Sequence, residues 1–188
     1  MSRSAASISV CTSAFQPARN RSTGAAYPCR NGDEYGIGVV SRWPSVPGAA
    51  PDGGIYPAQD PDDPEERAWL CLDVAGPAAV AVCTTHLAYT KRDVAAAQCS
   101  YLFGTVVARL RAKAAAPPLL VGGDLNLGSG DGAELRDCLP RGSALVDDGG
   151  EQHVVATPEL TVDGSRTIDL RGTTDHPGLL VTLAPAAP

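Results

Sequence analysis

The chain of 188 residues is long enough for one domain with a hydrophobic core and too short for two domains of ordinary size. Apolar residues make up 44% of the sequence and charged residues 19%, and no uncharged apolar run approaches the roughly 20 residues that span a bilayer. Membrane-spanning helices and simple polar disorder are therefore excluded, and a net charge of −6 disfavours a uniformly basic nucleic-acid-binding protein.

Six cysteines are spread along the chain without a Cys-x-x-Cys pair, which excludes a zinc ribbon and a thioredoxin-like motif. This number fits either disulfides formed in an oxidising compartment or buried free thiols. If disulfides form, the pairs to test are Cys71 with Cys83 and Cys83 with Cys99. The first ten residues are too polar for the apolar part of a secretory signal, so either the protein is not secreted by that route or its true N-terminus lies upstream.

The first third of the chain is expected to contain more loop than regular structure. Residues 1–34 are polar and predict an irregular N-terminal segment with room for one strand, followed by a domain over residues 35–188. The apolar run 35–41 predicts a buried strand. Prolines and acids between Pro44 and Pro64 predict an exposed loop that is too polar and too broken to pack.

A β-hairpin and one helix are predicted for the middle of the chain. Apolar runs at 68–74 and 78–84 flank an Ala-Gly-Pro turn, and in the resulting hairpin Cys71 and Cys83 would face each other. Helical spacing of apolar residues over 91–116 predicts the main helix, with Thr90 and Asp93 as start signals and Pro117 as the stop.

The remaining elements are short. Residues 119–123 predict a buried strand, 132–139 a second short helix, and 166–170 and 178–183 two terminal strands. Strands interleaved with helices over one domain predict an α/β or α+β layered architecture.

Polar side chains follow the ends of the predicted strands. They are His86, Asp124, Asn126, Asp169, Asp175 and His176. Because side chains alternate along a strand, Asp124 and Asn126 would point to one face if the extended conformation persists. Each motif alone also has an ordinary structural explanation, such as an Asx turn, a surface Asp–His hydrogen bond or a core histidine.

In combination and in this order, five segments resemble the endonuclease/exonuclease/phosphatase superfamily, the fold of DNase I and of apurinic endonucleases. They are Tyr-Gly-Ile-Gly-Val-Val-Ser-Arg-Trp-Pro at 35–44, Val-Cys-Thr-Thr-His-Leu at 82–87, Leu-Val-Gly-Gly-Asp-Leu-Asn at 120–126, Thr-Ile-Asp-Leu at 167–170 and Thr-Asp-His-Pro at 174–177. The resemblance implies an α+β, DNase I-like layered β-sandwich with flanking helices. It also implies a Mg²⁺ (or Mn²⁺) ion that supports phosphoester hydrolysis by water attack on phosphorus.

The resemblance also implies a role for each matching residue. The catalytic residues would be His86, Asp124, Asn126, Asp169 and His176. Asp124 would orient or activate the attacking water and, with Asp175, bind the metal. His86, Asn126 and His176 would contact the substrate phosphate, where imidazolium and amide N–H groups stabilise the charge that develops.

The chain departs from the family pattern in two places. The family's metal-binding glutamate, in a Leu-Gln-Glu-Val segment, has no counterpart, because Asp33 and Glu34 are the only acidic residues ahead of Val39 and stand in another context. We therefore expect an N-terminally truncated member, either a fragment or a natural short form. Only five residues separate Asp169 from Asp175, so either the sheet edge is trimmed or Asp169 is not the family's aspartate.

Three other functional classes can be compared with this hypothesis. The missing glutamate supports a catalytically inactive fragment or pseudoenzyme of the same fold that acts as a binding protein. An EF-hand starting at Asp124 fails because Gly128 and Ser129 stand where an oxygen ligand and a glycine are needed. A serine-hydrolase elbow fails because the chain contains no Gly-x-Ser-x-Gly.

The substrate stays open at this stage. The expected partner is a phosphoester: a small phosphodiester, a phosphomonoester, a lipid head group or a nucleic acid, which the acidic charge does not favour. Arginines at 19, 21, 30 and 42 are either a phosphate-approach patch or scattered solvated side chains. We expect a monomer. The cellular location stays open, and the number of cysteines favours an extracellular location, because related bacterial proteins with as many cysteines are often exported.

Overall fold

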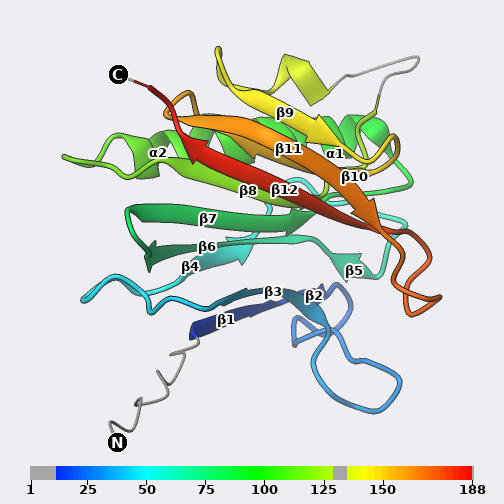
Figure 1. Cartoon of the computed structure of the whole chain (residues 1–188). Helices are drawn as coiled ribbons and strands as arrows, with labels where there is room; N and C mark the ends of the chain where they lie inside the picture. The colour runs from blue at the N-terminus through cyan, green and yellow to red at the C-terminus, as the bar shows by residue number, and fades with distance from the viewer. Residues whose placement is uncertain (1–11, 129–134, 188) are drawn as a thin grey trace, which may run out of the picture.

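A six-stranded sheet forms the centre of the computed structural model, which describes residues 12–128 and 135–187 (Figure 1). In spatial order its strands are β4 (Asp52–Ile55), β6 (Ala68–Ala75), β7 (Ala79–His86), β8 (Leu119–Asp124), β10 (Gln152–Ala156) and β9 (Ala144–Asp147). Strands β7 and β8 run parallel, whereas the other neighbours are antiparallel.

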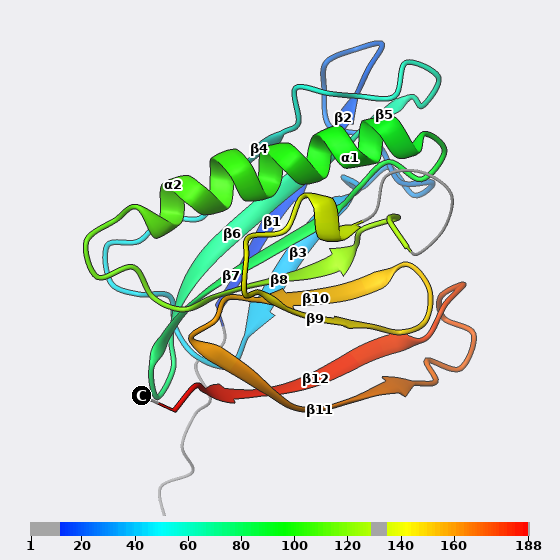
Figure 2. The same ribbon diagram turned by 90° about the horizontal axis from the view of Figure 1, so that it is seen from above.

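A helix covers one face of this sheet and connects β7 to β8 (Figure 2). It consists of α1 (Arg92–Tyr101), a π-helical stretch η1 (Leu102–Val107) and α2 (Ala108–Arg111). Parallel neighbours need such a crossover. Cys99 and Leu102 on the helix and Val121 on β8 are fully buried between the two layers, which places the main core there.

The second layer of strands lies on the opposite side of the sheet and consists of separate pairs. Strand β1 (Thr12–Pro17) pairs with β3 (Gly36–Ser41) beneath β6 and β7 (Figure 1), and β11 (Leu160–Ile168) pairs with β12 (Gly178–Pro185) beside β9 and β10 (Figure 2). This layer covers its face of the central sheet less fully than the helix covers the other face. Val82 and Leu120 face it and are half-buried, whereas Cys83 and Val121 on the helix side are fully buried.

These layers confirm the expected α+β layered sandwich and most of the expected elements. The predicted strands appear as β3, β6, β7, β8, β11 and β12, with β11 beginning earlier than expected at Leu160. Residues 1–34 hold β1 and the two-residue β2 (Arg19–Asn20), which pairs with β5 (Glu65–Glu66). Since β1 pairs with β3, the described part of this segment is hydrogen-bonded to the first strand of the expected domain.

The two helix predictions differ in outcome. The main helix ends at Arg111 rather than at 116. Thr90 does not cap it, because its hydroxyl donates to Asp60, and the N-cap residue is Lys91, whose side chain makes no capping hydrogen bond. Of the short helix expected at 132–139, the structure describes only residues 135–139, in which Leu135–Asp137 form a 3₁₀ turn, η2. The first residues of that helix lie outside the described residues.

The expectation of an exposed, unpacked loop from Pro44 to Pro64 was wrong. The segment contains the edge strand β4, and the side chains of Tyr56 and Asp60 are each only 2% exposed. The Tyr56 hydroxyl bonds Thr85 Oγ1 at 2.8 Å. Asp60 accepts hydrogen bonds from the Asp62 N–H and the Thr90 hydroxyl and pairs with Lys91. A carboxylate can be buried when it is hydrogen-bonded and paired in this way.

Two disulfides are present within residues 12–128 and 135–187. Cys71 and Cys83 are register partners in the β6–β7 hairpin and are joined, which confirms that they face each other. The alternative pair, Cys83 with Cys99, was wrong, because Cys99 on α1 is joined to Cys138. Among the described residues no helix is both long and apolar enough to cross a bilayer.

The disulfide pattern gives the first testable prediction. Mass mapping of the oxidised, unreduced protein is expected to yield the Cys71–Cys83 and Cys99–Cys138 peptides. Replacing Cys99 and Cys138 by alanine should lower the free energy of unfolding by roughly 3–4 kcal/mol, because the bond closes a loop with a sequence separation of 39. Denaturant melts of the two forms measure this difference, and free thiols at all four positions would contradict the prediction.

Candidate active site

Three strand ends meet at one end of the central sheet. Strand β7 ends at His86 and β8 at Asp124, which are register partners, and Gln152 at the start of β10 is paired with Asp124 on its other side. The Gly-Gly-Asp sequence permits this arrangement, because a Cβ on Gly123 would lie 2.1 Å from the Thr85 carbonyl oxygen. Only glycine allows β8 to approach β7 so closely at this point.

An open cavity of about 590 Å³ lies over these strand ends. Among its lining residues are five that the sequence predicted: His86, Asp124, Asn126, Asp175 and His176. The sixth, Asp169, is exposed and lines an adjoining hollow that shares Asp175 and His176. Its Oδ1 accepts a hydrogen bond from the Arg171 N–H at 2.7 Å, and its catalytic role stays a prediction.

One oxygen of Asp124 lies between two imidazole rings. Asp124 Oδ2 is 3.7 Å from His86 Nε2 and 3.6 Å from His176 Nε2. The exposed Asp175 carboxylate lies 3.5 Å from the same nitrogen of His176. The family-like residues from β7, β8 and the segment before β12 therefore meet at a single carboxylate.

Gln152 determines how the His176 ring is protonated. Its Oε1 accepts a hydrogen bond from the Leu179 N–H at 3.2 Å, so its amide nitrogen is the atom that faces His176 Nδ1 at 3.1 Å. The same Nδ1 also lies 3.4 Å from the Pro177 carbonyl oxygen, which can only accept. Because an amide nitrogen only donates and its contact is the shorter of the two, we assign the acceptor role to Nδ1 and the proton of a neutral ring to Nε2. That N–H is on the side of the ring that faces Asp124.

Burial shifts the pKa values of both groups on the parallel strand pair. Burial, the positive charge of Arg67 and His176 together lower the pKa of His86 to about 4, so this histidine is neutral at neutral pH. Burial and the negative charge of Glu151 raise the pKa of Asp124. Asp124 Oδ1 is buried and has no hydrogen-bond partner within the described ranges, which leaves it open to a water or an ion.

Asn126 reaches the cavity in a way that the sequence did not indicate. Its φ of +48° ends the extended conformation, so the condition under which Asp124 and Asn126 would point to one face of a strand is not met, although both line the cavity. Asparagine tolerates this left-handed conformation better than most residues. Its Nδ2 donates to the Leu87 carbonyl at 2.9 Å, which uses one of the two amide hydrogens and leaves the other available to a ligand.

The donor chemistry of the cavity fits a divalent cation. Four carboxylates line it, from Glu65, Asp124, Glu151 and Asp175, against the single guanidinium of Arg67. In the part of the chain that the structure describes, no three His, Cys, Asp or Glu side chains stand close enough to hold a metal by themselves. Mg²⁺ commonly uses one or two carboxylates together with waters and substrate phosphate, so Asp124 with a neighbouring carboxylate suits it.

Six lining residues of the cavity were given no role by sequence reasoning: Tyr35, Glu65, Arg67, Tyr89, Glu151 and Thr174. Tyr35 and Thr174 open two of the family-like segments but were assigned no role, and the other four belong to no motif. Tyr89 lies three residues after His86, and this nearness to the end of a strand was the only sequence feature that could have indicated a place in the cavity. Glu151 precedes β10, a strand that was not predicted, so its position could not be inferred.

Comparison with known proteins finds neither a matching family model nor a matching curated sequence. Solved structures do match. An endonuclease/exonuclease/phosphatase from Beutenbergia cavernae has a TM-score of 0.64 at 20% identity, covering 92% of this chain and 53% of that one. A mannosyl-6-phosphatase from Bacteroides thetaiotaomicron has a TM-score of 0.62 at 12% identity, covering 92% and 77%. A humanized D. rerio TDP2 has a TM-score of 0.58 at 18% identity, covering 81% and 72%.

At these identities the likeness concerns the fold. This chain spans about half the length of the Beutenbergia structure, at 53%. The match includes 92% of the residues of this chain, so nearly all of the chain takes part in the shared fold.

The pKa of His86 is a testable consequence of the geometry. Titration followed by NMR of the histidine ring protons is expected to give a value of about 4 for His86. Because this value lies below that of an unfolded histidine, stability should fall as the pH drops from about 6.5 toward 4. His86→Gln should remove that part of the pH dependence, and a His86 that titrates near 6.5 would contradict the account.

Proposed function

We propose that this chain, which has the fold of the endonuclease/exonuclease/phosphatase superfamily, hydrolyses phosphoester bonds by divalent-metal-dependent attack of water on phosphorus. The observation that carries the proposal is the position of Asp124 between His86 and His176 in an open, carboxylate-rich cavity. The names of two similar structures, an endonuclease/exonuclease/phosphatase and a mannosyl-6-phosphatase, support phosphoester chemistry.

Each residue would act through a specific atom. Asp124 Oδ2 would accept a hydrogen bond from the attacking water and draw its proton. The Nε2–H of His176 and the second amide hydrogen of Asn126 would donate to phosphoryl oxygens as negative charge develops on them. His86, neutral at neutral pH, would hydrogen-bond the leaving oxygen or a phosphoryl oxygen without adding a positive charge.

A Mg²⁺ or Mn²⁺ ion would be held by Asp124 with Asp175, and it would neutralise phosphoryl charge in a cavity that is otherwise acidic. The need for a cation follows from electrostatics, because a phosphoester brings negative charge to four carboxylates. The same carboxylates favour a small substrate with few charges over a long nucleic acid.

The second candidate is a binding protein of the same fold without catalysis. It is favoured by the absence of a three-residue metal cluster in the described ranges and by the lack of a family-like glutamate ahead of Val39. Metal-dependent turnover separates the two candidates, since a pseudoenzyme would show none.

Hydrolysis of bis(p-nitrophenyl) phosphate by the purified chain tests the proposal. Turnover is expected with magnesium and should disappear with EDTA. Asp124→Asn and His176→Gln should each lower kcat at least about 100-fold, because each removes a group that acts on the transition state. The melting temperature of Asp124→Asn should not fall, since the variant removes a buried charge whose pKa burial has raised.

Asp163→Asn is the matched control, since it removes an exposed carboxylate on β11, outside the cavity. It should keep wild-type activity. A folded wild type without turnover, or Asp124→Asn with wild-type activity, would contradict the proposed function.

A further inference from the structure

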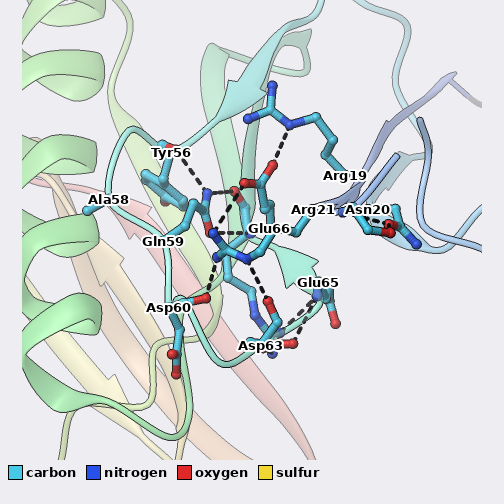
Figure 3. A network of polar contacts seen from close by, with 12 residues as sticks. Arg19, Asn20, Arg21, Tyr56, Ala58, Gln59, Asp60, Asp63, Glu65 and Glu66 are labelled. Atoms are coloured by element: carbon cyan, nitrogen blue, oxygen red, sulfur yellow. Dashed lines mark hydrogen bonds and ion pairs between the residues drawn. The ribbon is translucent and has the colours of Figure 1, made fainter. Parts of the chain in front are cut away.

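Arg67 lies at the wall of the cavity, and its main chain is held firmly. It stands between β5 and β6 and is 4% exposed. Its N–H donates to Gln59 Oε1 at 2.8 Å, and its carbonyl accepts from Gln59 Nε2 at 2.9 Å and from the Tyr56 N–H at 3.0 Å. Figure 3 shows Tyr56, Gln59 and Asp63 on the loop that supplies these contacts.

The guanidinium is only partly satisfied by its surroundings. Nη2 donates to Asp63 Oδ2 at 2.8 Å. Nη1 lies 3.2 Å from Glu65 Oε1, close enough for an ion pair but without the alignment of a hydrogen bond. Nε and Nη1 are buried, and neither has a hydrogen-bond partner within residues 12–128 and 135–187. Buried donors without an acceptor are rare in native proteins, so these two point to a ligand.

Tyr89 limits the direction from which a ligand can approach. The Arg67 Cζ atom lies 5.4 Å from the centroid of the Tyr89 ring, which also lines the cavity and is 63% exposed. With one side of the guanidinium next to an aromatic ring, its N–H groups that point away from the ring remain for an acceptor. Planar donors of this kind suit the oxygens of phosphate.

We infer that Arg67, backed by Tyr89, binds an anionic oxygen of the phosphoester substrate beside His86 and Asp124. The identity of this ligand rests on the proposed function, whereas oxyanion binding itself does not require catalysis. Among the described residues that line the cavity, Arg67 is the only arginine or lysine, so it supplies the one permanent positive charge there. The oxygen belongs either to the scissile phosphoryl group or to a second phosphate next to it.

Calorimetric titration of the folded chain with inorganic phosphate and with pyrophosphate, in the presence of magnesium, tests the inference. Arg67→Met should weaken binding at least about tenfold, because a charge-assisted hydrogen bond is lost. Loss with both ligands assigns the oxygen to the scissile group, and loss with pyrophosphate alone assigns it to a second phosphate. Arg67→Lys, which keeps the charge but has fewer donors, should bind with intermediate affinity.

Two controls keep folding and catalysis apart from binding. Arg109→Met removes an exposed arginine that pairs with Asp52 outside the cavity, and it should bind both ligands like the wild type. Tyr89→Ala removes an exposed aromatic ring that contacts Arg67 but leaves the guanidinium in place. It should weaken phosphate binding less than Arg67→Met does. Wild-type affinity in a folded Arg67→Met, or no binding of either ligand by the wild type, would overturn the inference.

The same titrations distinguish this inference from the proposed function. If the wild type binds phosphate through Arg67 but hydrolyses nothing, the proposed function fails and the inference stands. If the wild type turns over substrate and Arg67→Met leaves KM, kcat and phosphate affinity unchanged, the inference fails and the proposed function stands. In an active enzyme the inference predicts a raised KM with a smaller change in kcat.

Discussion

The parallel pairing of β7 with β8 is the constraint on which the candidate site depends. It places His86 opposite Asp124, and it requires both the helical crossover that covers the sheet and a glycine at 123. A shift by one residue would turn Asp124 to the other face of the sheet, into the core under the helix. The buried residues between helix and sheet, such as Leu102 and Val121, therefore fix the register and with it the polar groups at the strand ends.

The polar groups around this pairing have pKa values and hydrogen-bonding states that differ from those of the same groups in water. Burial keeps His86 neutral, raises the pKa of Asp124 and leaves one oxygen of that carboxylate without a partner. Arg67 is buried with two unsatisfied donors. Unsatisfied groups of both signs facing one cavity are costly to folding, and a bound cation and an oxyanion would satisfy them together. Under the proposed function, the cavity would therefore bind a metal–phosphate pair better than either ion alone.

The sequence was informative where local pattern and long-range structure agree. Apolar runs bounded by glycine or proline predicted β3, β6, β7 and β8, and the polar residues that follow them form much of the cavity. Strands β9 and β10 were missed because they are short and lie between turn-forming residues. The packing of the loop near Asp60 could not be predicted, because its partners Thr90 and Lys91 are distant in sequence. Arg67 carries no local signal, since its role arises from burial and from Tyr89.

The central claim is that water attacks phosphorus at the end of β7, β8 and β10. Its most direct test is hydrolysis of bis(p-nitrophenyl) phosphate with magnesium in water enriched in the heavy oxygen isotope, followed by mass spectrometry of both products. The account predicts that the label enters the phosphoryl product and that p-nitrophenol contains none. Label in p-nitrophenol, or no product from the folded chain, would contradict it.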